Sequence, residues 1–378
     1  MTITQEQRTR TSVHGNPWLP SLHGTGLVMR IELLRRRPST KGYIAYGLTF
    51  LAIIGLGVLV AVLAGSDKTS IPLELVLVLV LGVGFLIGPS LSATSINGDS
   101  GEGVLAPLQM TRLTAGDLAL GKLLASWAVS IAALVTTTPF LIYAYGRSGW
   151  TLTELLLVLA VILFLVLMAT AIGLAWSAIA ARAVASVSLA HLTSGALILG
   201  SLLLFAFTAP LVSEEVTVIH VQRDSENVTD EQWNDPDFDY EALPCVEVEV
   251  PYQIMHSDRT AWLLLINPAV VIAEVSPIVN PETFEKDGRA APGIFALIHS
   301  EVSGARLGPE EPQVYDECAG YFGDEDAWQK RNMEKALMPP APWLGLGLAA
   351  VLLVGSVVIV IRRLRVPYKT LRAGSRVA

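Results

Sequence analysis

Residues 153–181 read TELLLVLAVILFLVLMATAIGLAWSAIAA, an apolar run in which Glu154 is the only charged side chain. A helix needs about 20 such residues to cross the hydrocarbon core of a bilayer. Apolar residues make up 52% of the 378-residue chain and charged residues only 16%, against about a quarter in soluble domains. The sequence therefore predicts an all-α polytopic membrane protein with six transmembrane helices, at residues 43–65, 72–96, 118–145, 153–181, 184–212 and 343–361.

The charges are distributed unevenly along the chain. Residues 211–341 hold 26 acidic and 8 basic side chains, a net charge of −18, which leaves 8 acidic and 18 basic side chains, a net charge of +10, elsewhere. Basic residues gather before the first apolar run and after the last one. Because Lys and Arg near span ends favour the cytoplasmic side, both termini of this multi-pass chain are expected in the cytoplasm. The membrane itself is expected to be the plasma membrane.

This topology divides the chain into five parts. They are the cytoplasmic N-terminus with an amphipathic helix (1–42), five spans with an inner loop at 97–117 (43–212), an acidic extracellular domain (213–341), the sixth span (342–361) and a basic cytoplasmic tail (362–378). β-branched residues in Val216–Val221 and Val246–Val250 indicate strands, so the extracellular domain is expected to be mixed α/β.

Cys245 and Cys318 are the only cysteines, and both lie in the predicted extracellular domain. An outer compartment permits a disulfide, which would close a loop of about 70 residues. Two unpaired, buried thiols are the alternative.

The same domain contains the apolar segment Trp262–Val275, WLLLINPAVVIAEV, with Asn267-Pro268 near its middle. Its 14 residues are too few to span a bilayer. We expect either a buried helix or a re-entrant piece that enters the outer leaflet.

The inner loop from Asp99 to Lys122 reads DSGEGVLAPLQMTRLTAGDLALGK. Thr114 and Asp117 have the spacing of a capping box, which predicts that a helix begins near Ala115.

A short helix is expected before that cap, with Val104, Leu105 and Leu108 on one side and charged flanks at Asp99, Glu102 and Arg112. Such a helix suits docking to another protein. A helix that rests on the lipid interface is the alternative.

The segment Gly26–Lys41 is the second feature of the predicted cytoplasmic face. Leu27, Ile31 and Leu34 follow i, i+4, i+7 spacing, while arginines occupy the other sides. This pattern predicts a basic amphipathic helix along the cytoplasmic leaflet.

The inner loop resembles the signature of bacterial ABC-2 type transporter permeases, which typically has an acidic start, Gly-Thr-Leu-Glu, a Leu-rich turn, Thr-Pro-Leu-Ser, an acidic residue and Gly-Lys. The corresponding residues are Asp99, Gly103-Val104-Leu105, Thr111, Leu113-Thr114, Asp117 and Gly121-Lys122, without a gap over about 24 residues. The sequence departs from the pattern at Ala106, where the family usually has Glu, and at Arg112, where it usually has Pro.

Two further segments are similar to the same family. Arg30-Ile31-Glu32-Leu33 resembles its elbow helix, and Leu265-Ile266-Asn267-Pro268 resembles its outer segment before the last span.

The resemblance implies the permease subunit of an ABC transporter, an exporter, driven by a separate ATPase subunit that docks on residues 99–113. ATP and Mg²⁺ would bind to that partner, because the chain has no Gly-x-x-x-x-Gly-Lys-Ser/Thr phosphate loop. No catalytic residue, cofactor or metal site is expected in this chain, and no nucleic-acid partner. Six spans are half of the usual transporter, so a homodimer or a pairing with a similar permease is expected.

The residues expected to couple to the ATPase are Asp99, Glu102, Val104, Leu105, Leu108 and Arg112. Either Leu105→Asp or Leu108→Asp is expected to abolish co-purification of the ATPase without preventing membrane insertion.

A different class of function remains open. In this alternative the chain is a non-transporting membrane sensor or binding scaffold that uses its acidic extracellular domain. As part of a transporter, the same domain would accept a cationic cargo or an accessory protein, or would be a solvated cap.

Overall fold

The computed structural model describes residues 18–36, 40–63, 69–225, 228–229, 233–236, 238–287, 289–309, 316–319 and 325–365. The first 17 residues of the predicted N-terminal part and the predicted tail from residue 366 onward lie outside this description.

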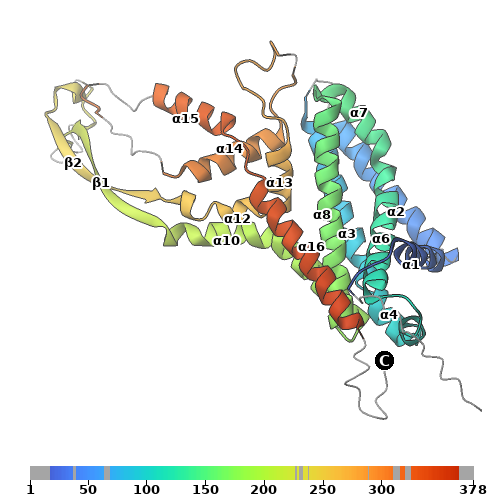
Figure 1. The fold of residues 1–378 in the computed structure, drawn as a ribbon. Coiled ribbons are helices and arrows are strands. Elements are labelled where there is room, and N and C mark those ends of the chain that lie inside the picture. Colours follow the sequence, from blue (N-terminus) through green and yellow to red (C-terminus); the bar gives the residue numbers. More distant parts are fainter. Residues whose placement is uncertain are drawn as a thin grey trace, which may run out of the picture.

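Long helices form a bundle (Figure 1). In the described part of the chain, five helical stretches are long and apolar enough to cross a membrane: Ile71–Gly101, Ala115–Ser148, Leu152–Ile179, Ala183–Thr208 and Trp343–Leu364. The first predicted span, 43–65, overlaps the 24-residue helix α2 (Thr40–Leu63). That α2 also crosses the membrane, which would bring the number of spans to six, stays a prediction. The helical architecture agrees with a polytopic membrane protein.

Several of these stretches are built from more than one helix. In the first, α3 (Ile71–Ser92) is followed by the short α4 (Ser95–Gly101). In the second, α6 (Ala115–Leu134) passes through a 3₁₀ turn into α7 (Thr138–Ser148), and Pro139 lies in the first turn of α7, where its missing N–H is harmless.

The stretch Ala183–Thr208 consists of α9 (Ala183–Gly195), a π-helical turn η2 (Ala196–Gly200) and α10 (Ser201–Thr208). By contrast, α8 (Leu152–Ile179) and α16 (Trp343–Leu364) are uninterrupted.

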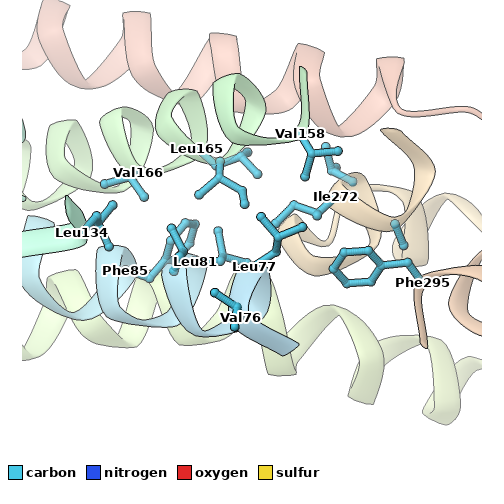
Figure 2. Packing of buried hydrophobic residues seen from close by; sticks show 14 of the residues in the cluster. Val76, Leu77, Leu81, Phe85, Leu134, Val158, Leu165, Val166, Ile272 and Phe295 are labelled. Carbon is cyan, nitrogen blue, oxygen red and sulfur yellow. The ribbon is translucent and has the colours of Figure 1, made fainter. Parts of the chain in front are cut away.

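The main core lies between α3 and α8 (Figure 2). Leu77 and Leu81 of α3 meet Leu165 and Val166 of α8, and all four are buried. The same cluster continues into α13 (Pro268–Val275) through Ile272 and into α14 (Ile294–Leu307) through Phe295. The predicted extracellular part is therefore packed directly against the bundle.

A two-stranded antiparallel sheet extends away from the bundle (Figure 1). Strands β1 (Ser213–Arg223) and β2 (Cys245–Met255) pair from Ser213 opposite Met255 to Arg223 opposite Cys245. The two predicted strand segments are thus confirmed. Cys245 forms a disulfide with Cys318, which joins the end of the sheet to a later part of the chain.

The apolar segment Trp262–Val275 forms two short helices, α12 (Trp262–Leu265) and α13. Asn267 separates them: its side chain accepts from Ala269 N–H (2.9 Å) and donates to Ile198 O (2.7 Å). Most of α13 is buried, as the prediction of a buried helix requires. Helix α15 (Glu325–Leu337) also belongs to this part.

Candidate functional site

One end of the bundle gathers the segments that the sequence analysis singled out. Helix α1 (Leu22–Arg35) lies against α6, and α4 and α5 (Leu105–Gln109) lie beside them. The end of α16 reaches the same place, where Ile361 and Leu364 join a buried apolar cluster with Leu105 and Leu118.

Asp117 caps two helices at once. Thr114 and Asp117 form a capping box at the start of α6, with Asp117 N–H donating to Thr114 Oγ1 (3.0 Å) and Thr114 N–H donating to Asp117 Oδ2 (2.9 Å). The other carboxylate oxygen accepts from the backbone N–H of Ser21 (2.6 Å), the N-cap residue of α1. The beginning of α1 is therefore tied to the beginning of α6.

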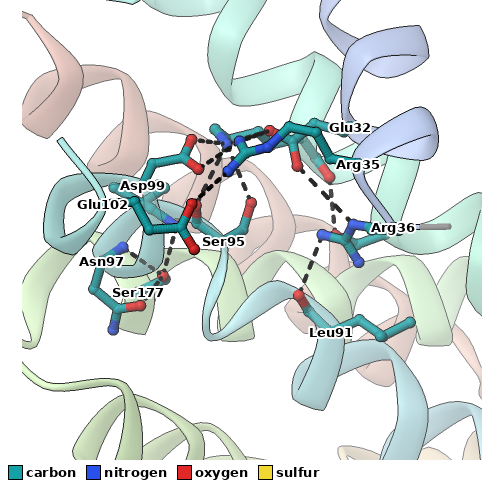
Figure 3. A network of polar contacts seen from close by, with 12 residues as sticks. Glu32, Arg35, Arg36, Leu91, Ser95, Asn97, Asp99, Glu102 and Ser177 are labelled. Atoms are coloured by element: carbon teal, nitrogen blue, oxygen red, sulfur yellow. Dashed lines mark hydrogen bonds and ion pairs between the residues drawn. The ribbon is translucent and has the colours of Figure 1, made fainter. Parts of the chain in front are cut away.

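A cluster of ion pairs joins α1, α4 and α6 (Figure 3). Lys122 of α6 is fully buried, at 0% exposure, and its ammonium group donates to Glu32 of α1 and to Asp99 of α4 (2.5 Å). Arg35 of α1 donates to the other oxygen of Asp99 (2.7 Å) and to Glu102 (3.0 Å). We call Glu32, Arg35, Asp99, Glu102 and Lys122 the ion-pair cluster.

The electrostatics of this cluster depend on burial. The hydrogen bond from Arg35 to Asp99 raises the pKa of the guanidinium group above its ordinary value, at which it is already a cation. Charges removed from water are stable only when their partners and hydrogen bonds are in place. Because Lys122, Glu32 and Asp99 are all buried, each depends on the position of the other two.

Polar contacts also fix the turn between α3 and α4. Arg36 donates to Leu91 O (3.3 Å) and to Ser126 Oγ (2.9 Å) of α6. Ser177 Oγ of α8 accepts from Ile96 N–H (2.9 Å), close to the start of α4 (Figure 3). The loop that carries α4 and α5 is therefore attached to α1, α6 and α8.

Contact with the last candidate span completes these attachments. Gln109 Nε2 of α5 donates to Leu364 O (3.1 Å) at the end of α16. A displacement of α5 would consequently act on both the second and the last helical stretches of the bundle.

The predicted coupling residues fall into two groups. Asp99 and Leu105 are buried, and Val104 and Leu108 are half-buried, with both leucines packing against the chain's own apolar cluster. Glu102 and Arg112 are exposed. The apolar side of α5 therefore faces inward. The surface beyond it consists of Glu102, Pro107, Met110, Thr111 and Arg112, which we call the outer face of the loop.

Because Leu105 and Leu108 face inward, substituting them does not test partner binding alone. Leu105→Asp would put a carboxylate into a buried apolar cluster, so a loss of partner binding would not be separable from misfolding. Met110 is the most exposed apolar residue of the segment, at 82%, and reports on the outer face directly.

Sequence reasoning did not find the pairing of Lys122 with Glu32. A lysine within the apolar run 118–145 was a usable signal, since a charged side chain there needs a partner. Its partner lies 90 residues earlier in the chain, and spacing alone does not identify it.

The predicted apolar side of α1 lies outward. Leu27 and Leu34 are exposed, whereas Thr25, Val28 and Glu32 face the protein. An outward leucine row suits the expected contact with lipid.

Neither a metal-binding group nor a known relative identifies this site. Within the described ranges, no three His, Cys, Asp or Glu side chains lie close enough to hold a metal ion. The sequence matches no protein-family model and no curated protein.

Proposed function

We propose that this chain is the membrane-spanning permease subunit of an ABC transporter, an exporter, located in the plasma membrane with both termini in the cytoplasm. A separate ATPase subunit binds ATP and Mg²⁺ and docks on the outer face of the loop. Two copies, or one copy and a similar permease, make the complete transporter.

The observation that carries the proposal is the way in which the loop 99–113 is attached to the rest of the molecule. Its inner side is joined to α1 and α6 by the ion-pair cluster and to α16 by Gln109. Its outer face presents Met110 and Arg112 to the surroundings. A partner that moves this face would thus move several helices together, as a rigid-body transition requires.

The test is co-purification of an ATPase with variants of the outer face. The full chain is purified from its native host in mild detergent, and bound proteins are identified by mass spectrometry and assayed for ATP hydrolysis. Met110→Asp and Arg112→Glu are expected to lower the recovered ATPase by about tenfold or more, which corresponds to about 1.4 kcal/mol of binding free energy. Both side chains are exposed, so the yield of folded chain should not change.

Met255→Asp is the matched control, because Met255 is also an exposed methionine but is the last residue of β2, in the sheet that projects from the bundle (Figure 1). Equal ATPase recovery from wild type and from both loop variants would contradict docking on the outer face. A folded wild-type chain that carries no ATPase would instead favour the non-transporting sensor or scaffold.

A further inference from the structure

A buried carboxylate and a buried histidine meet where the sheet-bearing part of the chain joins the last candidate span. Glu274 of α13 is 1% exposed and His299 of α14 is 4% exposed. His299 Nδ1 lies 2.9 Å from Glu274 Oε1, and His299 Nε2 lies 3.1 Å from Met338 O. Met338 belongs to the segment between α15 and α16.

Both ring nitrogens of His299 therefore face oxygen atoms that accept hydrogen bonds. A neutral imidazole has one N–H group and satisfies only one such acceptor. The second nitrogen would then direct its lone pair at the lone pairs of an oxygen, which is an unfavourable contact. Ser303 Oγ is 3.5 Å from Nε2, too long to replace the contact with Met338.

The other oxygen of Glu274 is already occupied. Glu274 Oε2 accepts from Ala341 N–H (2.6 Å), and Arg306 lies 3.8 Å away. Oε1 is therefore the carboxylate oxygen that faces the His299 ring, and a ring with N–H groups at both nitrogens would donate to Oε1 and to Met338 O at once.

We propose that Glu274 and His299 form a proton-binding site, and that the bound proton holds α13 and α14 to the segment that leads into α16. The pair carries one proton more than a carboxylate with a neutral imidazole. When that proton leaves, His299 loses its hydrogen bond either to Glu274 or to Met338. The attachment of α16 to the preceding helices is then weakened.

The surroundings of the pair contain other charges, but most of them have partners of their own. Arg306 also donates to Pro339 O (2.9 Å), in the same segment before α16. Further charged residues come from the neighbouring helices. Glu74 of α3 accepts from Phe295 N–H (2.9 Å), and Glu154 of α8 pairs with Arg289 (2.8 Å). On α15, Arg331 donates to Gly308 O (2.8 Å), and the side chain of Lys335 lies against Gly304.

Glu274→Gln is the decisive variant. Its carbonyl oxygen would still accept from Ala341 N–H, while its amide group would donate to Nδ1 of a neutral His299. His299 Nε2–H would then donate to Met338 O. The hydrogen bonds to Ala341, His299 and Met338 are kept, whereas the need for the additional proton disappears together with the negative charge that faces Arg306.

The first measurement is the protonation of His299 by NMR with ¹⁵N-labelled histidine in the full chain, purified in detergent. The sequence has six histidines, and the signal of His299 is identified as the one that disappears in the His299→Asn variant. In wild type near pH 7, both ring nitrogens are expected to carry protons, whereas in Glu274→Gln one nitrogen carries none. A wild-type spectrum with one unprotonated nitrogen below neutral pH would overturn the proposal.

The second measurement is the Tm of wild type and Glu274→Gln between about pH 5 and about pH 8, where histidines titrate. A proton bound more tightly in the folded state stabilises the protein at low pH, and this contribution falls as pH rises. The wild type is expected to lose several degrees more than Glu274→Gln over this range. Parallel profiles of the two proteins would overturn the proposed link between the proton and the attachment of α16.

Discussion

At the scale of single residues, Lys122 is the side chain on which the candidate coupling site depends. It is buried within an apolar helix and contacts two carboxylates that come from different elements, α1 and α4. Burying a charge without a partner costs far more than a pair of matched charges. The three groups therefore specify how α1, α4 and α6 fit together.

Lys122→Met tests this dependence. The change keeps most of the side-chain volume but removes the buried ammonium group, so that Glu32 and Asp99 keep only their contacts with Arg35 and Arg36 at the edge of the cluster. It should cost about 3–5 kcal/mol of folding stability. Thermal unfolding of the purified full chain in detergent measures the loss. Arg112→Met is the control: Arg112 is exposed, and its removal should change stability by no more than about 0.5 kcal/mol. Equal Tm values for the two variants would argue against the stabilising role of the cluster.

At the scale of elements, the approach of α1 to α6 depends on a residue without a side chain. A Cβ atom at Gly121 would lie 2.5 Å from Val28 Cβ and 3.0 Å from Thr25 O, closer than atoms of a folded protein pack. Val28 and Thr25 are the inward residues of α1. Any larger residue at position 121 must therefore push α1 away from the bundle.

Gly121→Ala should consequently destabilise the chain by roughly 1–3 kcal/mol, the usual cost of overpacking. Gly82→Ala provides the comparison, because a Cβ atom there meets nothing within 4 Å. In that variant the higher helix propensity of alanine should raise stability by up to about 1 kcal/mol. The unfolding midpoints of both variants measure these changes in stability. A Gly121→Ala variant as stable as wild type would show that α1 is not packed against α6 as described.

The elements themselves were largely predictable from sequence, because their signals are local. Runs of apolar residues located α3, α8 and α16, and the spacing of Thr114 and Asp117 located the start of α6. The direction of the apolar side of α5 was not predictable. Leu105 and Leu108 would look the same whether they faced a partner or the chain's own α16, and only the packing of distant helices distinguishes the two.

At the scale of the whole molecule, the chain combines a helical bundle with a projecting sheet. The two parts share one apolar core through Ile272 and Phe295, and Glu74 of α3 accepts a hydrogen bond from the first turn of α14. The far end of the sheet is held by the Cys245–Cys318 disulfide instead, at a sequence separation of 73 residues.

The disulfide predicts a simple chemical result. Alkylation of the denatured chain should add no group without a reductant and two groups after reduction, as read by intact mass. Reduction should also destabilise the sheet-bearing part by roughly 2–4 kcal/mol, because it frees a long loop in the unfolded state. Alkylation of either cysteine before reduction would contradict the bridge.

The double cap made by Asp117 also bears on how the chain is made. Ser21 precedes Asp117 by 96 residues, and a ribosome adds about 5–20 residues per second. Helix α1 is therefore synthesised roughly 5 to 20 s before the carboxylate that accepts from its N-cap residue. During that interval α1 has only the Ser21 hydroxyl as a cap, and neither Asp117 nor Lys122 has been synthesised. A nascent chain arrested before residue 117 should thus show α1 open to protease, and one arrested well beyond residue 122 should show it protected.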